Sequence, residues 1–338
     1  MGVATNATHL KETASHPLET HELNARIWSD GQTRDSKMTW LELMVAVITL
    51  TAYTGWIHIL MLLGISAVFW QVPRLILIVL SSTLLLPARP VLWTSFNRSW
   101  VFSTWRKYFK FSYLLEAPSR PGSRLVMAEF PHGVFPMGPL LAGTLCQILF
   151  PDFNIFSLAA SSVFSVPGWR HFVAWMGSMP ATRSNYRLLL SKGSVAVIVG
   201  GIAEMFLQHP HKQIVKLLTR KGFVEVAVEE GADAVVPVYH FGNTDVLDIF
   251  PQCMGRLSRR MRAAGGFMYG VAGLPVPRRK PIYMVTGSPI PITKTSRNEA
   301  GFQAEVDRVH GLVVKELQAL YDRHKASFGW QDKPLEIQ

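Results

Sequence analysis

Cysteine is scarce in this sequence, and its scarcity argues against two kinds of cross-linked structure. Only two cysteines occur among 338 residues, Cys146 and Cys253, and they lie far apart with no ligand-like spacing. Neither a disulfide framework nor a zinc site is therefore indicated. So few thiols are typical of a chain whose functional part lies in a reducing compartment.

Several common catalytic motifs are also absent. The sequence has no G-x-S-x-G elbow, no G-x-x-x-x-G-K-[ST] phosphate loop, no H-E-x-x-H pair and no G-x-G-x-x-G turn after a strand. The pair in His209-Pro210-His211 has no obvious third ligand, so we interpret it as a surface loop. We expect neither a metal ion nor a resident cofactor.

Acidic residues are fewer than basic ones. Lys and Arg total 34 against 23 for Asp and Glu, which gives a formal net charge of +11. This surplus favours an anionic partner, whether nucleic acid, a phosphate-bearing small molecule or acidic lipid. Hydrophobic residues make up 49% of the chain, which favours membrane contact as well.

The N-terminal region shows no periodicity and no cleavable signal. We predict a disordered tail over residues 1–37, because they are polar and charged. From Leu43 to Trp70 the chain has no Lys, Arg, Asp or Glu, and this run exceeds the ~20 apolar residues needed to cross a bilayer. A second apolar run extends from Leu75 to Leu86. We predict a membrane hairpin over residues 38–93, which either crosses the bilayer twice or dips into one leaflet.

Basic and aromatic residues are interleaved around residues 94–124, which we expect to lie at the membrane interface. Clustered Lys and Arg beside a membrane segment favour the cytoplasmic side, so the bulk of the protein is expected to be cytosolic. The aromatic residues fit either the headgroup layer or a buried cluster. They are Trp93, Phe96, Trp100, Trp105, Tyr108 and Phe109.

The pattern of residues 125–330 predicts an α/β domain with a mainly parallel sheet and flanking helices. Expected strands are Leu125 to Ala128, Val195 to Val199, Ala234 to Tyr239 and Ile282 to Thr286, and expected helices are Pro139 to Leu149, Trp169 to Met176, Asn185 to Ser191, Phe223 to Glu230 and Glu299 to His324. Gly177, Gly193 and Gly231 stand where a helix would end on a left-handed residue. We expect residues 331–338 to be a tail.

Two turns that each follow a predicted strand are the candidates for chemistry. In Pro131-His132-Gly133, a fixed proline and a glycine hold a histidine that titrates near neutral pH. In Gly200-Gly201, two glycines precede the carboxylate of Glu204. If the strands are adjacent, Glu204 could orient the imidazole of His132 and stabilise its protonated form. The alternatives are a histidine bonded to its own loop and a solvated glutamate.

Basic residues near the ends of the predicted elements are candidates for holding phosphates. We select Arg183, Arg220 and Lys221, although most exposed cations are simply solvated.

A set of short motifs, in this order, resembles the type 2 diacylglycerol acyltransferase family, which includes monoacylglycerol and wax-alcohol acyltransferases. The resemblance covers residues 40–330. The motifs are Glu129-Phe130-Pro131-His132-Gly133, Val199-Gly200-Gly201-Ile202-Ala203-Glu204, Arg220-Lys221-Gly222-Phe223, Gly231-Ala232-Asp233, Pro237-Val238-Tyr239-His240-Phe241-Gly242-Asn243, Gly273-Leu274-Pro275, Gly287-Ser288-Pro289-Ile290 and Leu320-Tyr321-Asp322-Arg323-His324-Lys325.

The resemblance implies acyl transfer from acyl-CoA to the hydroxyl of diacylglycerol, at the endoplasmic reticulum or on lipid droplets. It implies a fold like that of other glycerolipid acyltransferases, with His132 as the catalytic base. Those enzymes carry an aspartate where this chain has Met137, so Glu204 is the candidate partner. Phe130 departs from the His or Tyr of many members and could alter the acceptor pocket. Pro131, Gly133, Gly200, Gly201 and Asn243 are expected at the substrate.

Other functions remain open on the sequence alone. The acceptor could instead be a monoacylglycerol or a long-chain alcohol, and the chain could be a non-catalytic relative that coats lipid droplets. A nucleic-acid binder ranks last, because no readout motif is present. A homo-oligomer is not excluded.

Overall fold

The computed structural model describes residues 26–117, 122–150, 153–261 and 263–338. Residues 1–25, most of the predicted tail, lie outside this range. The described part is built around one sheet in the order β1-β2-β11-β8-β3-β6-β4-β5, with β12 paired to β8. Its strands are β1 (Ile27–Trp28), β2 (Ser112–Leu115), β3 (Leu125–Phe130), β4 (Ile155–Ala159), β5 (Ser178–Pro180), β6 (Ser194–Ile198), β8 (Ala234–Phe241), β11 (Tyr283–Thr286) and β12 (Ile290–Pro291).

The sheet is mainly parallel, as predicted. Strand β3 lies between β6 and β8 and is parallel to both, with Val126 opposite Val195 and Val235. Strand β11 runs antiparallel to β8. All six residues of β3 are buried, which explains why its apolar run has no alternation. The carboxyl ends of β3 and β6, where His132 and Glu204 follow, are therefore side by side.

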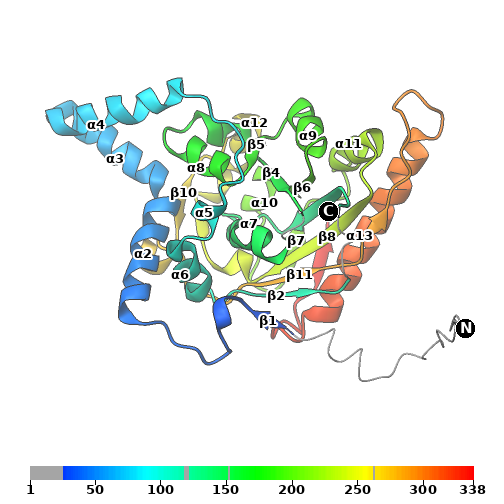
Figure 1. Cartoon of the computed structure of the whole chain (residues 1–338). Coiled ribbons are helices and arrows are strands. Elements are labelled where there is room, and N and C mark those ends of the chain that lie inside the picture. The colour runs from blue at the N-terminus through cyan, green and yellow to red at the C-terminus, as the bar shows by residue number, and fades with distance from the viewer. Residues whose placement is uncertain (1–25, 118–121, 151–152, 262) are drawn as a thin grey trace, which may run out of the picture.

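Helices cover both faces of the sheet (Figure 1). One face is covered by α9 (Arg183–Leu190), α11 (Gly222–Glu230) and α13 (Phe302–His324), and the other by α2 (Trp40–Thr54), α6 (Trp100–Tyr108), α7 (Met137–Leu149) and α8 (Trp169–Trp175). The predicted apolar stripe of α13 is buried along its length, from Phe302 to Leu320. Short helices α5 (Thr94–Asn97), α10 (Ile202–Met205) and α12 (Gly255–Met261) complete the domain.

The long charge-free run near the N-terminus is not one helix. It breaks at Gly55 into α2 and α3 (Trp56–Phe69), which are bent by 68°. Helix α2 belongs to the core of the domain, because its residues Ala46 and Leu50 are fully buried in the hydrophobic cluster on that face of the sheet. By length and composition, none of the described helices could cross a membrane alone, whereas the bent pair of α2 and α3 together could.

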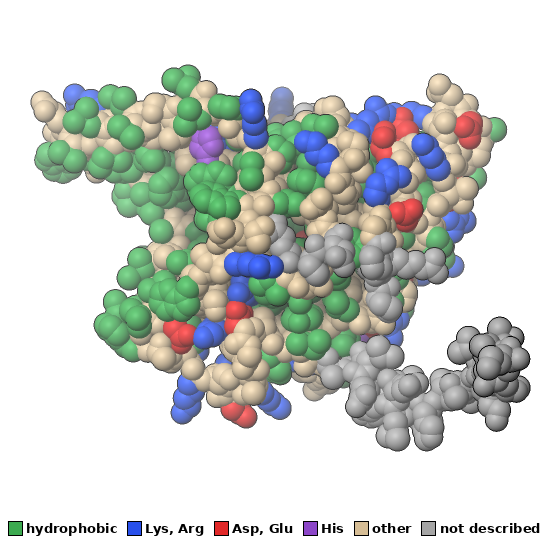
Figure 2. All heavy atoms as spheres, viewed as in Figure 1, with side chains coloured by type: hydrophobic (Ala, Val, Ile, Leu, Met, Phe, Trp, Pro, Cys, Tyr) green, Lys and Arg blue, Asp and Glu red, His purple; other side chains and the backbone are tan. Residues whose placement is uncertain are grey.

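Two helices extend away from the domain. Helices α3 and α4 (Gln71–Ser82) pack on each other, and neither has a buried residue. Figure 2 shows this projection covered largely by hydrophobic side chains. Its exposed large residues include Met61, Leu62, Ile65, Val68, Phe69, Trp70, Val72, Leu75, Ile78 and Val79. The hydrophobic projection therefore consists of α3 and α4, and α2 anchors it to the domain.

The aromatic residues of the predicted interfacial segment are divided between the two interpretations. Trp105, Tyr108 and Phe109 are buried in the core, while Trp93 and Trp100 are about half exposed. The buried cluster is therefore the correct interpretation for Trp105, Tyr108 and Phe109, whereas Trp93 and Trp100, at the start of α6, face outward.

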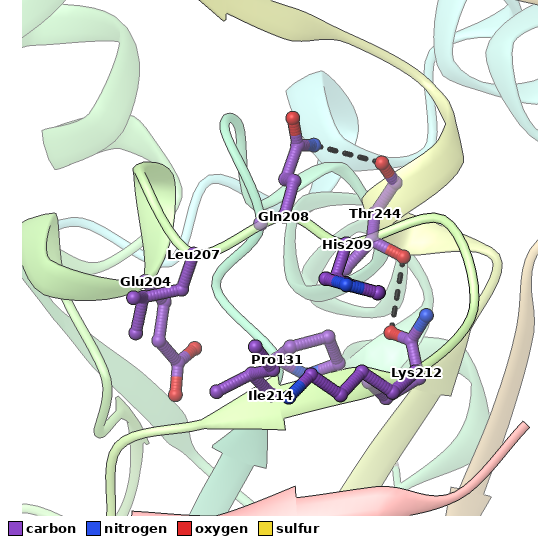
Figure 3. Close-up of a pocket in the computed structure, with 10 residues that line it drawn as sticks. Pro131, Glu204, Leu207, Gln208, His209, Lys212, Ile214 and Thr244 are labelled. Carbon is purple, nitrogen blue, oxygen red and sulfur yellow. Dashed lines mark hydrogen bonds between the residues drawn. The ribbon is translucent and has the colours of Figure 1, made fainter. Parts of the chain in front are cut away.

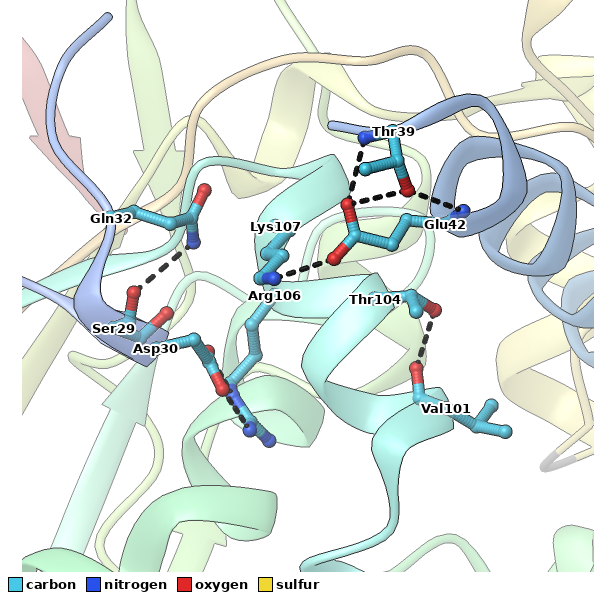
Figure 4. A network of polar contacts seen from close by, with 9 residues as sticks. All are labelled: Ser29, Asp30, Gln32, Thr39, Glu42, Val101, Thr104, Arg106 and Lys107. Atoms are coloured by element: carbon cyan, nitrogen blue, oxygen red, sulfur yellow. Dashed lines mark hydrogen bonds and ion pairs between the residues drawn. The ribbon is translucent and has the colours of Figure 1, made fainter. Parts of the chain in front are cut away.

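A buried ion pair connects the N-terminal segment to the domain (Figure 4). The guanidinium of Arg106 donates to both carboxylate oxygens of Asp30, at 2.7 and 2.6 Å, and to the Thr144 hydroxyl of α7 at 2.9 Å. Lys107 donates to Glu42, which also forms a capping box with Thr39 at the start of α2. The predicted disordered tail is therefore wrong for residues 27–31, which form β1 and a helical turn on the domain.

The last residues are not a tail either. Residues 335–337 form strand β13 (Leu335–Ile337), which pairs in parallel with β7 (Gln213–Val215) in a separate two-stranded sheet. A second small sheet pairs β9 (Asp248–Phe250) with β10 (Phe267–Tyr269). Both were missed because their strands are only three residues long.

The structure confirms two of the three glycines expected in the left-handed region. Gly177 and Gly231 have φ values of 83° and 67°, and Gly231 caps α11. Gly193 is not among the positive-φ glycines of the described residues. Its role is close approach, because a Cβ there would lie 2.3 Å from the carbonyl oxygen of Asn154.

Candidate active site

The turn that carries His132 links β3 to α7 and requires a glycine at position 133. Gly133 has a φ of +62°, which other residues rarely adopt. A Cβ at this position would also lie 2.8 Å from the side-chain nitrogen of Asn243. The turn is therefore closely packed against the end of β8, and the backbone around His132 is fixed on both sides.

The imidazole of His132 is held by its own turn. Its Nδ1 lies 2.8 Å from the carbonyl oxygen of Gly133. A carbonyl can only accept, so the proton of the neutral ring is on Nδ1 and the lone pair is on Nε2. Burial lowers the pKa of His132 below its ordinary value of 6.5. The ring is thus a neutral base at physiological pH, with Nε2 as the atom that can take a proton.

Glu204 lies beside His132, as the adjacent strands predict, but it does not contact the imidazole. One carboxylate oxygen accepts the backbone N–H of His132 at 2.6 Å, and the other accepts the backbone N–H of Lys216 at 2.7 Å. The prediction that Glu204 orients the ring is therefore wrong. Its side chain, 2% exposed, fixes the main chain of the histidine instead.

Burial of Glu204 has an electrostatic consequence. It raises the pKa of this carboxyl to about 7, against the opposing effects of its two backbone donors and of the positive charge of Arg220. The carboxyl therefore titrates near physiological pH. Its charged form is the better acceptor for two N–H groups, since each oxygen then accepts one donor.

The two glycines before Glu204 make room for its carboxylate. A Cβ at Gly200 would lie 1.8 Å from the carboxyl carbon of Glu204. Gly201 has φ +56° and ψ −151°, a conformation suited to glycine. These residues shape the turn after β6.

Asn243 positions the histidine turn from the end of β8. Its side-chain nitrogen donates to the carbonyl oxygens of Pro131 and His132, both at 3.0 Å, and its oxygen accepts the N–H of Gly138 at 2.8 Å. The side chain is fully buried. These three contacts use both of its donors and its oxygen, so Asn243 holds the histidine turn in place.

The predicted phosphate-binding residues are not brought together. Arg183 forms ion pairs with Glu225 and Glu229, and Lys221 pairs with Asp307 on α13. Arg220 is exposed and lies close enough to Glu204 to lower the pKa of that carboxyl. Only Arg220 of the three is thus placed near the site.

A polar pocket opens beside the histidine turn (Figure 3). In this view Glu204 and Lys212 flank Pro131. The pocket is bounded by Gln208, whose side-chain nitrogen donates to the carbonyls of Thr244 and Leu247, both at 2.8 Å. The lining residues are Pro131, Gly133, Glu204, Leu207, Gln208, His209, Lys212, Gln213, Ile214 and Thr244. Within the adjacent loop, His209 accepts the N–H of His211 at 3.2 Å.

A second buried pair lies under the start of α7. The Nε2 of His240 on β8 is 3.8 Å from a carboxylate oxygen of Glu129 on β3. His240 is fully buried, and neither ring nitrogen has a hydrogen-bond partner among the described residues. Gly138 permits this arrangement, since a Cβ there would meet the His240 ring at 2.7 Å. The sequence signal was a single polar residue in each of two apolar strands.

The sequence comparisons agree with the motifs. A family model described as diacylglycerol acyltransferase matches residues 62–338. The chain is 31% identical to diacylglycerol O-acyltransferase 2-like protein 6 of Bos taurus over 69% of this chain and 75% of that protein. It is 29% identical to 2-acylglycerol O-acyltransferase 1 of Mus musculus over the same two shares.

One solved structure is also similar, the 1-acyl-sn-glycerophosphate acyltransferase of Thermotoga maritima. It has a TM-score of 0.37 and 14% sequence identity, and the alignment covers 83% of this chain and 100% of that one. This likeness is too weak to support an inference about the chain.

Proposed function

Because this chain belongs to the diacylglycerol acyltransferase family, we propose that it transfers a fatty acyl group from acyl-CoA to the hydroxyl of diacylglycerol, making triacylglycerol. The observation that carries this proposal is the state of His132. Its Nδ1–H is bonded to the carbonyl of Gly133, and so its Nε2 is left as the base that an alcohol acceptor requires.

The reaction follows from that geometry. Nε2 of His132 takes the proton of the acceptor hydroxyl as its oxygen attacks the thioester carbonyl carbon. The tetrahedral intermediate then collapses, the carbon–sulfur bond breaks, and the thiolate of CoA takes the proton from the imidazolium. The products are the new ester and free CoA, and the histidine returns to its neutral form.

The developing oxyanion needs hydrogen-bond donors at the same turns. Within the described residues, the backbone N–H groups of Gly133 and Gly201 donate to no other group. We assign these two amides to the oxyanion, since unpaired backbone donors beside a reacting carbonyl are suited to this role. Arg220 is the candidate contact for a CoA phosphate, because it is exposed close to Glu204.

The acceptor is a lipid, and the α3–α4 projection offers a way to reach it. At 1.5 Å per residue, α3 and α4 are about 21 and 18 Å long, which is less than the ~30 Å hydrocarbon core of a bilayer. We therefore infer a hairpin that dips into one leaflet rather than crossing twice. The domain would then lie on the cytosolic face of the endoplasmic reticulum membrane or of lipid droplets.

The test is acyl transfer by the full chain purified in detergent. We expect labelled acyl groups to pass from acyl-CoA to diacylglycerol, and His132→Ala to abolish transfer while leaving the melting temperature close to that of the wild type. His211→Ala, a change to an exposed loop histidine, is the matched control and should keep full activity. Full activity of His132→Ala would refute the assignment of the base.

The acceptor class is a separate question. The mouse relative is named for a 2-acylglycerol acceptor, so parallel assays should include monoacylglycerol and a long-chain alcohol. A larger kcat/KM for either one would replace diacylglycerol as the acceptor without changing the role of His132. Absence of turnover with all three would favour a non-catalytic lipid-droplet protein.

A further inference from the structure

Strand β7 and the three residues after it are hydrogen-bonded on two sides. On one side, the last residues of the sequence pair with it: Gln213 N–H donates to the carbonyl of Pro334 at 2.9 Å, and Gln338 N–H donates to the carbonyl of Val215 at 2.8 Å. The carbonyl of Gln338 also accepts the N–H groups of Leu217 and Leu218, at 2.8 and 2.9 Å.

On the other side lies the candidate active site. Lys216 is between these paired residues, and its N–H donates to Glu204 at 2.7 Å. The same carboxylate accepts the N–H of His132 at 2.6 Å. A continuous series of hydrogen bonds therefore runs from Gln338 through residues 215–218 and Glu204 to the main chain of His132.

Strand β13 is itself firmly attached to the domain. Leu335 is buried, and the hydroxyl of Tyr321 on α13 donates to the carbonyl of Lys333 at 3.0 Å. A two-stranded sheet is marginal by itself. The position of β7 therefore depends on β13 on one side and on the Glu204 carboxylate on the other.

We propose that β13 is a positioning element of the active site, which acts through β7 and Glu204 to hold the His132 turn in its working geometry. This inference rests on the proposed function of His132. Strand β13 acts on the reacting atoms indirectly, because its effect is transmitted by the Lys216 amide.

The positioning role predicts an electrostatic signature. The Lys216 N–H lowers the pKa of Glu204, so a loosened β7 should raise that pKa. The other groups that lower the pKa of this carboxyl are the His132 N–H and the charge of Arg220, and a loosened His132 turn would raise the pKa in the same direction. Tyr239, which also faces Glu204, is held uncharged by burial. A change in the pH profile would therefore report on the two N–H contacts of the Glu204 carboxylate.

The test is Gln338→Pro, with Gln338→Ala as its control. Proline removes the N–H that bonds to Val215, whereas alanine keeps the backbone donor and acceptor. We expect Gln338→Pro to lower kcat about tenfold, the effect of losing one hydrogen bond to a charged group, with little change in KM. The acidic limb of its kcat profile should move to higher pH. Gln338→Ala should match the wild type in both respects.

A milder variant protects the test against misfolding. Leu335→Ala removes a buried anchor of β13 and leaves the backbone groups intact. It should therefore lower kcat and move the acidic limb to higher pH, as Gln338→Pro does, but by smaller amounts. A lower kcat with an unmoved acidic limb in both variants would overturn the proposal, because it would indicate only a smaller folded fraction.

Hydrogen exchange separates this inference from the proposed function. In Gln338→Pro, the backbone amides of residues 132–135 should exchange faster than in Gln338→Ala. If the wild type transfers no acyl group but this exchange difference is present, the function fails and the coupling stands. If the wild type is active and exchange at the turn is equal in the two variants, the coupling fails.

Discussion

Two ionisable residues, Glu204 and His132, set the pH range in which the turn can work. The imidazole must be neutral to take a proton, and burial keeps its pKa below 6.5. The carboxyl must be charged to accept two N–H groups well, and its pKa is about 7. We therefore expect kcat to rise with pH through about 7, with Glu204 as the controlling group, in rates measured between pH 5 and 9.

The variant Glu204→Gln identifies the group. In glutamine only the side-chain oxygen accepts, so it can bond to one of the N–H groups of His132 and Lys216. The NH₂ group would face the other N–H, donor against donor, and kcat should fall. The remaining acidic limb should then report on His132 and lie below pH 6.5. A limb that stays near pH 7 in this variant would show that another residue controls it.

The site residues that could be predicted from the sequence are those whose role depends on their immediate neighbours in the chain. His132 and the glycine turns are local patterns, and the neighbouring strands placed Glu204 correctly. Its atomic contact could not be predicted, because the direction of a buried carboxylate depends on the turn geometry at Gly200 and Gly201. The ion pairs of Arg183 and Lys221 with residues of other helices were equally inaccessible to sequence patterns.

At the level of elements, the α3–α4 projection predicts where the membrane is bound. Ile65→Lys places a charge on a side chain that is 61% exposed on this projection and should weaken binding to phospholipid vesicles severalfold. Leu312→Lys, on the exposed face of α13, is the matched control and should leave vesicle binding unchanged. Vesicle flotation of the detergent-purified proteins measures both, and equal binding by the two variants would show that other surfaces bind the membrane.

The elements also show how the residues of the predicted hairpin differ in their burial. A charge-free run reveals that a segment avoids water but not whether lipid or protein covers it. Ala46 and Leu50 are covered by the domain, so α2 is a core helix, whereas α3 has no buried residue. The long strands were predicted because continuous apolar runs are specific to buried parallel sheets. Strands β7 and β13 are too short for such a run.

For the whole molecule, Glu204 gives activity and stability opposite pH dependences, because its charged form supports the active turn and its protonated form favours folding. Its pKa is about 7 in the folded protein and 4.5 ordinarily, so folding favours its protonated form. That contribution to stability is complete below about pH 4.5 and is lost as the pH rises through about 7. It is on the order of 3 kcal/mol. Between pH 5 and 8 the melting temperature of the wild type should therefore fall by more than that of Glu204→Gln in the same detergent. Parallel falls in both proteins would assign the loss to other groups.

The pairing of β7 with β13 also has a consequence for the order of events during synthesis. The His132 turn and Glu204 emerge from the ribosome well before residues 334–338, which supply the main-chain partners of β7. A nascent chain can build the central strands β3, β6 and β8 but must wait for Gln338 to complete the bonds around Lys216. On the coupling proposed above, the His132 turn would reach its full activity only once this residue has been made.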